Sequence, residues 1–321
     1  MKLARILTVI FVAMCSGTGA FAQSWPAKPV RMIAPFAPGG IVDAITRIVA
    51  PKLSEAWGQP VIVENVVGGG GAAGTEMVAK SLPDGYTLLS TSNSQVISAA
   101  IKKNLTYDPL NDFIPVTSLI RQSYVLAVGT PAGVKTIPQL IAAAKAKPGE
   151  LTFTSSGIGS GTHLMGEKFN LDAGVKMGHV PMSGGADTYD ALIAGRVTYW
   201  FTPITSALPH VREGRLIALG VSGARRMGVI PEVPTIAEAG LAGFESTLWF
   251  GIWAPAGTPA GVVEKIAKDI SQALAAPDVR EQLAKLSAEA MVMAPAEFGR
   301  FVRSEAESVA RTVKAAGIKP Q

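Results

Sequence analysis

The feature that most constrains this chain is a repeated alternation between short apolar runs and amphipathic segments. In the first stretch, apolar runs at 30–36, 61–66 and 87–92 predict strands, and helices are expected at 43–57 and in the segment that ends at Lys80. Short buried strands separated by helices are typical of a mainly parallel sheet that is covered on both faces. The alternation therefore predicts an α/β fold.

The same alternation restarts in the middle of the chain. A restart of this kind predicts two lobes, each a mainly parallel sheet flanked by helices, with a ligand cleft between the lobes. The expected strands are 125–128, 151–155, 179–182, 197–201 and 216–221, and the expected helices are 137–146, 162–171 and 187–194.

Beyond residue 255 the pattern changes to helices alone. Segments 259–275, 278–286 and 295–316 predict helices with no strand between them, so they must cover a sheet that is formed elsewhere. We expect the chain to cross to the second lobe near Arg121, to return near Phe244, and to leave these helices on the first lobe. The expected domains are lobe 1 at 23–121 and 245–321 and lobe 2 at 122–244.

Residues 1–22 predict a secretory signal peptide. The segment begins with the basic residues Lys2 and Arg5, continues with an apolar run at 6–15, and ends with small residues before an expected cleavage after Ala22. Its removal predicts a periplasmic protein. Because the single cysteine, Cys15, lies in the removed segment, the mature chain is expected to be held by its core without disulfides.

Composition argues against several classes of function. The chain has 29 Lys and Arg against 24 Asp and Glu, and no run of Lys or Arg is longer than Arg225-Arg226, so the pattern of a nucleic-acid-binding protein is missing. Its three histidines are widely spaced, and the mature chain has no cysteine, so the sequence does not predict a metal site. We expect no cofactor.

One motif resembles the glycine-rich loop with which some enzymes bind a dinucleotide cofactor. Gly69-Gly70-Gly71-Ala72-Ala73-Gly74 matches the dinucleotide-binding pattern, but the next strand ends in Ser92-Asn93-Ser94, without the acidic residue that would hold a ribose. We interpret the motif as a turn at which strand and helix approach closely. A carboxylate-processing enzyme stays an alternative, but we expect a binding protein without catalytic activity.

Three loops follow predicted strands, lead into helices and have the features of an anion-binding site. Glycine lets backbone N–H groups converge, and the start of a helix carries partial positive charge. Ligands bind open α/β sheets at the carboxyl ends of the strands, so these loops are expected to face one cleft. The three loops are 34–40, 154–163 and 183–187. We further expect Ser183 and Asp187 in the third loop, Ser92 and Asn93 after a neighbouring strand, and Phe201 on a strand expected to face the cleft to contact the ligand.

A series of motifs, in order and spacing, resembles the Bug-type periplasmic receptors of tripartite tricarboxylate transporters. The motifs include Pro35-Phe36-Ala37-Pro38-Gly39-Gly40-Ile41-Val42-Asp43, Pro83-Asp84-Gly85-Tyr86-Thr87, Ser156-Gly157-Ile158-Gly159-Ser160 and Pro231-Glu232-Val233-Pro234-Thr235. The resemblance implies a two-lobed periplasmic binding protein whose first loop and serine-glycine loop hold a small carboxylate. The residues that it implies for this role are Phe36, Gly39, Gly40 and Asp43 in the first loop, and Ser155, Ser156, Gly159, Thr162 and His163 in the serine-glycine loop. It also implies a monomer that delivers this ligand to integral-membrane transporter subunits, one large and one small.

The chain departs from the family pattern beside the predicted site. Where relatives commonly have Val-Pro-Tyr-Lys-Gly-Gly, this chain has Val180-Pro181-Met182-Ser183-Gly184-Gly185. The loss of a tyrosine and a lysine is expected to change the ligand preference. The sequence leaves open whether the ligand is a di- or tricarboxylate, an aromatic acid or an acidic amino acid. A chemosensory or regulatory carboxylate receptor is an alternative to a transport protein.

Overall fold

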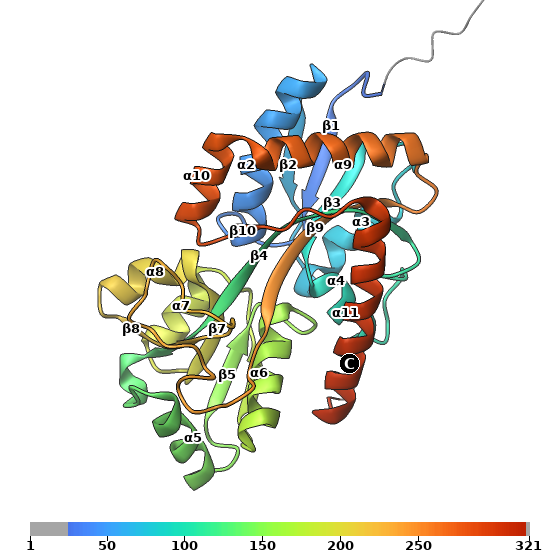
Figure 1. Ribbon diagram of the computed structural model, residues 1–321. Coiled ribbons are helices and arrows are strands. Elements are labelled where there is room, and N and C mark those ends of the chain that lie inside the picture. Colours follow the sequence, from blue (N-terminus) through green and yellow to red (C-terminus); the bar gives the residue numbers. More distant parts are fainter. Residues whose placement is uncertain (1–24, 319–321) are drawn as a thin grey trace, which may run out of the picture.

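The computed structural model describes residues 25–318, and the predicted signal peptide lies outside this range. A ten-stranded mixed sheet runs through the molecule in the order β2-β1-β3-β9-β4-β7-β5-β6, and β8 and β10 both pair with β4. Helices flank the sheet in two lobes (Figure 1). Within the described range, no helix combines the length and apolar character needed to cross a membrane.

Lobe 1 is formed by the beginning and the end of the chain. Its outer strands β1, β2 and β3 pair in parallel, whereas β9 pairs antiparallel with both β3 and β4. The strands are β1 (Val30–Ala34), β2 (Val61–Asn65), β3 (Thr87–Ser92), β9 (Thr247–Pro255), β10 (Glu289–Ala290) and the first part of β4 (Phe113–Gly129). The helices are α2 (Ile41–Trp57), the short 3-10 helix η2 (Gly69–Gly71), α3 (Ala72–Ala79), α4 (Ser94–Ile101), α9 (Ala260–Ala275), α10 (Pro277–Lys285) and α11 (Pro295–Ala315).

Lobe 2 is formed by the middle of the chain. Here β5 pairs in parallel with β6 and β7, whereas β7 and β8 pair antiparallel with the end of β4. The strands are β5 (Thr152–Ser155), β6 (Gly178–Pro181), β7 (Tyr199–Pro203) and β8 (Leu216–Val221). The helices are the 3-10 helix η3 (Thr130–Ala132), α5 (Ile137–Ala146), α6 (Gly161–Ala173), α7 (Ala186–Ile193) and α8 (Ile204–Arg212).

Strand β4 belongs to both lobes. It pairs with β9 from Phe113 to Ser123, and with β7 and β8 from Tyr124 onward. The predicted strand at 125–128 is therefore only the end of a strand of 17 residues. The predicted lobe boundary at 121/122 falls inside this strand. That the two lobes move as separate rigid units stays a prediction.

Polar side chains lie inside β4 because they bind a neighbouring segment. The hydroxyl of Thr117 donates to the carbonyl of Met293 at 2.7 Å, and Ser118 and Gln122 donate to other carbonyls of the segment around β10. Strand β10 pairs with β4 at Ile120 and Arg121. The expectation that no strand separates the C-terminal helices is therefore wrong at this point, because a two-residue strand covers the edge of β4.

Candidate ligand-binding site

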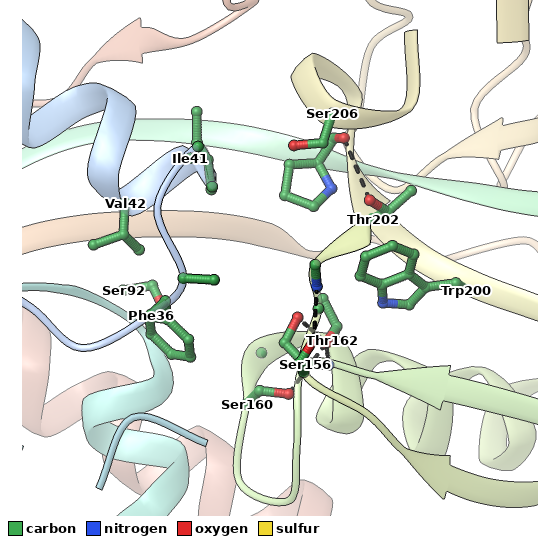
Figure 2. Close-up of a pocket in the computed structure, with 18 of the residues that line it drawn as sticks. Phe36, Ile41, Val42, Ser92, Ser156, Ser160, Thr162, Trp200, Thr202 and Ser206 are labelled. Atoms are coloured by element: carbon green, nitrogen blue, oxygen red, sulfur yellow. Dashed lines mark hydrogen bonds between the residues drawn. The ribbon is translucent and has the colours of Figure 1, made fainter. Parts of the chain in front are cut away.

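A cavity of about 320 Å³ lies between the two lobes at the carboxyl ends of the strands (Figure 2). The loops after β1, β5 and β6, the end of β7, the first turns of α8 and the crossing strands β4 and β9 form its walls. Residues lining it from lobe 1 include Phe36, Ala37, Pro38, Gly39, Gly40, Ile41, Val42, Ser92, Leu248 and Phe250. Residues lining it from lobe 2 include Tyr124, Ser156, Ser160, Thr162, Ser183, Gly184, Gly185, Tyr189, Trp200, Thr202, Ser206 and His210.

On the lobe 1 side, the loop after β1 turns into α2. Gly39 has a φ of +77°, which favours glycine, and its N–H donates to Asp43 Oδ2 at 3.0 Å. The other carboxylate oxygen of Asp43 accepts from Arg47 Nε at 2.9 Å. Asp43 is buried beneath the loop and does not line the cavity, so its contacts shape the loop from below.

On the lobe 2 side, hydroxyl groups fix the loop between β5 and α6. Ser160 is the N-cap of α6, and its Oγ accepts from the N–H of His163 at 3.3 Å and donates to the carbonyl of Gly157 at 2.6 Å. The N–H of Ser156 donates to Thr162 Oγ1 at 2.9 Å. Ser156, Ser160 and Thr162 all line the cavity, so the groups that hold the loop also face the ligand space.

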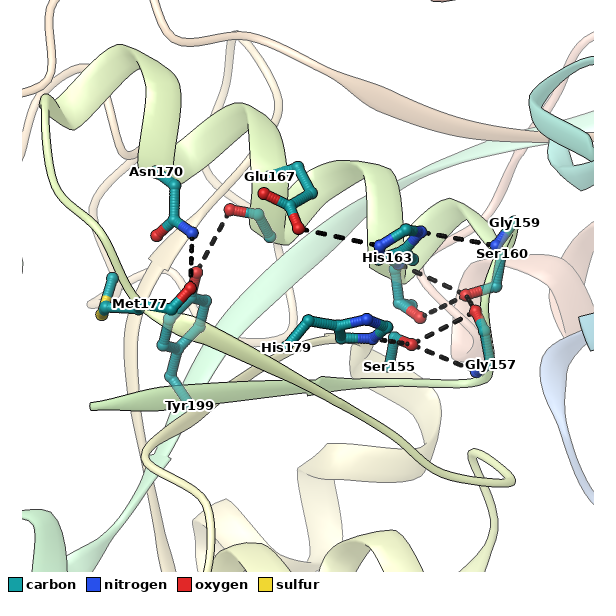
Figure 3. Close-up of polar contacts among 12 residues, drawn as sticks. Ser155, Gly157, Gly159, Ser160, His163, Glu167, Asn170, Met177, His179 and Tyr199 are labelled. Atoms are coloured by element: carbon teal, nitrogen blue, oxygen red, sulfur yellow. Dashed lines mark hydrogen bonds and ion pairs between the residues drawn. The ribbon is translucent and has the colours of Figure 1, made fainter. Parts of the chain in front are cut away.

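Two stacked histidines support this loop from behind (Figure 3). The rings of His163 and His179 lie 4.1 Å apart, and His179 Nε2 is 2.7 Å from Ser155 Oγ. Burial lowers the pKa of His163 to about 4 and that of His179 to about 3, with the neighbouring His163 contributing to the second shift. Both rings are therefore neutral at neutral pH and act as packing and hydrogen-bonding groups.

The Ser155–His179 contact has the length expected of a nucleophile and its base. Ser155, however, is fully buried and does not line the cavity. Its Oγ also accepts from the N–H of Gly157 at 3.1 Å. The contact therefore anchors the loop and offers no route for a substrate to reach the hydroxyl.

Four helices begin at the cavity. The N-cap or first residues of α2, α6, α7 and α8 are among the lining residues. The first N–H groups of a helix have no acceptor inside it, and they carry the positive end of the helix dipole. At α7 this charge is already balanced by Asp187, which accepts from Ser183 Oγ at 2.5 Å in the first turn. The first turn of α2 also carries an acidic residue, Asp43, but its carboxylate is paired with Arg47 at 2.9 Å. No acidic residue lies in the first turn of α6 or of α8. Of these helix starts, those of α2 and α6 face each other from opposite lobes and are available for one anion.

Three rings of lobe 2, Tyr189, Trp200 and His210, form what we name the aromatic wall. The ring of Tyr189 lies 4.9 Å from Trp200 and 4.6 Å from His210. Met182, which stands where relatives commonly have tyrosine, packs against the same cluster. Side chains alternate along β7, so with Trp200 at the cavity, Phe201 lies on the other face and stacks on Phe244. The structure thus places Phe201 in the core and away from the cleft.

The lobes touch beside the cavity. A Cβ atom on Gly70 of lobe 1 would lie 2.5 Å from the carbonyl oxygen of Ile158 in lobe 2, so the two loops are in direct contact. The side chain of Ile158 packs on the core of lobe 1. Lys102 at the end of α4 donates to the carbonyl of Gly69, and burial lowers its pKa to about 8. The Gly69–Gly74 motif thus forms a close approach between the lobes as well as a turn.

The structure divides the predicted site residues into two groups. Those lining the cavity are Phe36, Gly39, Gly40, Ser92, Ser156, Thr162 and Ser183. Those outside the lining are Asp43, Asn93, Ser155, Gly159, His163, Asp187 and Phe201. Several of the second group hold the loops in place, and whether any of them contributes to binding stays a prediction.

Sequence reasoning missed the lining residues on α8, β4 and β9. Ser206 and His210 lie on α8, whose helical pattern is interrupted by Pro209. Its apolar positions Ile204, Ala207 and Val211 have helical spacing and were the available signal. In residues 25–318, no three His, Cys, Asp or Glu side chains are grouped so that they could hold a metal ion.

Comparison with known proteins gives consistent matches over most of the chain. Residues 45–318 match the family described as the tripartite tricarboxylate transporter family receptor. BugT of Bordetella pertussis is 34% identical over 324 residues, covering 99% of each chain. A Pseudomonas protein encoded in a tcbD-tcbE intergenic region is 39% identical over 306 residues, covering 94% of this chain and 91% of its own.

Solved structures resemble the fold closely. A protein of R. palustris with adipate superposes with a TM-score of 0.88 at 32% identity, covering 92% of this chain and all of the other. MatC from Rhodopseudomonas palustris with bound malate has a TM-score of 0.84 at 31% identity, covering 90% of this chain and all of the other. The periplasmic binding protein BugD has a TM-score of 0.86 at 30% identity, with 92% and 100% covered.

Proposed function

Because this chain belongs to the tripartite tricarboxylate transporter receptor family, we propose that it is a periplasmic solute-binding protein that captures a small organic carboxylate. Two of the similar structures hold adipate and malate, which are both carboxylates. The family is one of ligand-binding receptors, which supports a binding role in place of a catalytic one.

The observation that carries the proposal is the pair of helix starts that face each other across the cavity. The start of α2 offers N–H groups from lobe 1, and the start of α6 offers N–H groups together with the hydroxyls of Ser156 and Thr162. Hydrogen bonds from such donors to a charged acceptor contribute about 1.5 to 3 kcal/mol each. A carboxylate between them is stabilised without a buried cation.

In this proposal the lobes close on the ligand, with β4 and β9 as the two connections about which they bend. The contact between Gly70 and Ile158 belongs to the closed form. The exported monomer, freed of residues 1–22, then presents the closed shape to one large and one small membrane subunit. The ligand must bind the closed form better than the open one, because equal affinity for both forms would leave the equilibrium between them unchanged.

A thermal-shift screen over mono-, di- and tricarboxylic, aromatic and amino acids tests the proposal. A ligand at 100 times its dissociation constant adds about 2.7 kcal/mol to the free energy of unfolding, which is readily measured. We expect at least one carboxylic acid to raise the melting temperature, and its amide analogue to have no effect. Stabilisation by the amide, or by none of the acids, would contradict the proposal.

A further inference from the structure

The lining of the cavity carries no net charge at neutral pH. Within the described residues, no Asp, Glu, Lys or Arg side chain lines it. Burial raises the pKa of Tyr124 and that of Tyr189, the latter to about 12. Burial also lowers the pKa of His210, and Arg215 adds to this shift, so these lining groups are neutral.

This lining distinguishes between classes of carboxylic acid. The helix starts of α2 and α6 satisfy one carboxylate. A second carboxylate would have only the start of α8 and the neighbouring hydroxyls of Thr202 and Ser206, without a cation, and the ammonium group of an amino acid would find no carboxylate. The remainder of the ligand is therefore expected to be neutral.

The aromatic wall shows what shape this neutral part has. Tyr189 lies between Trp200 and His210, and Phe36 and Phe250 line the cavity from lobe 1. Aromatic rings bury a large area and pack best against other flat rings, either offset or edge to face. A planar ring therefore fits this part of the cavity better than a flexible aliphatic chain does.

Two nitrogen atoms in the aromatic wall have no partner. Within the described part of the chain, Trp200 Nε1 and His210 Nδ1 are buried without a hydrogen bond, and Trp200 as a whole is 1% exposed. In Figure 2 the indole nitrogen lies on the edge of Trp200 nearer to Ser156 and Thr162. An indole N–H can only donate, and a buried donor without an acceptor costs free energy. A ligand oxygen would supply that acceptor.

We propose that the ligand is an aromatic monocarboxylic acid with a neutral oxygen substituent, and that Trp200 determines this specificity. The carboxylate lies at the starts of α2 and α6, the ring packs on the aromatic wall, and the substituent accepts a hydrogen bond from Trp200 Nε1. The inference rests on the proposed function, the binding of a small carboxylate in this cavity.

Calorimetry with benzoate, 3- and 4-hydroxybenzoate, adipate and malate tests the inference. We expect a hydroxybenzoate to bind about tenfold more tightly than adipate or malate. In Trp200→Phe a smaller aromatic ring replaces the indole and the N–H is lost, so that hydroxybenzoate should bind about 3- to 10-fold more weakly than in the native protein, and benzoate should lose less than hydroxybenzoate does. Trp249→Phe is the matched control, because Trp249 Nε1 donates to Glu305 at 2.8 Å and its side chain does not line the cavity.

Each other outcome overturns a defined part of the inference. Tighter binding of adipate or malate would refute the aromatic ligand and leave the proposed function intact. No binding of any of the five acids would refute the aromatic ligand, whereas the proposed function would be refuted only if every acid of the thermal-shift screen failed as well. Equal weakening of benzoate and hydroxybenzoate in Trp200→Phe would show that Trp200 only packs, and the benzoate titration and a melting curve show that the variant is folded.

Discussion

The two lobes line the cavity with different kinds of chemical group. Lobe 1 presents backbone and apolar side chains, including Phe36, Ile41 and Val42 (Figure 2). Lobe 2 presents hydroxyl groups, including those of Ser156 and Thr162, together with the aromatic wall. Lobe 2 therefore offers the groups that can discriminate between ligands, and lobe 1 offers mainly backbone amides and an apolar surface.

This difference suggests an order of events. Backbone amides satisfy any carboxylate, whereas a set of hydroxyls and rings satisfies only some ligands. We infer that lobe 2 selects the ligand and that lobe 1 closes over it. Changes in lobe 2 should therefore alter which ligand binds, and changes in lobe 1 should alter how well any ligand is held.

The largest expected effect is acid sensitivity confined to lobe 2. The pKa values of His163 and His179 fall from about 6.5 in the unfolded chain to about 4 and about 3 in the fold, so the unfolded chain binds more protons. Above pH 6.5 both states hold neutral histidines, so the free energy of unfolding does not depend on these groups. Below pH 6.5 the unfolded chain takes up protons that the folded chain does not, so the free energy of unfolding falls, by about 2 kcal/mol for each histidine at pH 5.

Denaturant unfolding at pH 7 and pH 5 measures this effect. His179→Gln should lose about half of the pH-dependent difference, whereas the matched change at the half-buried His210 should remove less. Hydrogen exchange should show the loop of residues 155–163 opening at pH 5 before the loop of residues 36–43. Simultaneous opening of both loops would mean that the two walls are equally sensitive.

The next largest effect is expected at Thr162. Thr162→Ala removes a hydroxyl that faces the cavity and accepts from the N–H of Ser156, so affinity should fall by about 1.5 to 3 kcal/mol, roughly 10- to 150-fold. Thr162→Ser keeps the hydroxyl and should bind nearly as well as the native protein. Calorimetry with the acid found in the screen measures both, and an equal loss in the two variants would show that the methyl group matters instead.

A smaller effect is expected where lobe 1 meets lobe 2 at Gly70. A Cβ at Gly70 collides with the carbonyl of Ile158, so Gly70→Ala should disfavour closure by about 1 to 3 kcal/mol and weaken binding without touching the ligand. Gly58→Ala is the matched control, since its φ of +62° is close to the +61° of Gly70 but its Cβ meets open space. Small-angle scattering with saturating ligand should show a larger radius only for Gly70→Ala.

The smallest effect is expected at Asp43. Asp43→Asn keeps one oxygen acceptor for Gly39 or Arg47 and loses the charge, so affinity should fall by about 0.5 to 1.5 kcal/mol, roughly 2- to 10-fold, for every acid alike. Asp187→Asn is the comparison in lobe 2, because Asp187 is exposed at the start of α7. A change in the order of ligand preference in Asp43→Asn would contradict a purely supporting role for lobe 1.

The sequence was sufficient to locate the loops but insufficient to locate the aromatic wall. Ser156 and Thr162 follow a short buried strand and precede a helix, so their place at the sheet edge follows from local pattern alone. Trp200 and Phe201 are neighbours on one strand, and which of them faces the cavity depends on the packing of Phe201 against Phe244, a contact between distant residues.

The crossing strand β4 shows a second limit. Its centre contains Thr117, Ser118 and Gln122, which interrupt the apolar run and hide a strand of 17 residues. These side chains are buried because the segment around β10, more than 160 residues later in the chain, supplies carbonyl acceptors. Local pattern cannot reveal an acceptor that arrives from so far away.

The uncharged lining also affects how the ligand is released. A ligand held by a buried arginine leaves an unpaired cation behind, whereas amide and hydroxyl donors exchange the ligand for water with comparable hydrogen bonds. Within residues 25–318 only neutral groups line the cavity, so separation of the lobes is enough to rehydrate the anion. If the lobes close as proposed, the residence time of the ligand is the lifetime of the closed form, and a partner that separates the lobes releases the ligand without breaking an ion pair.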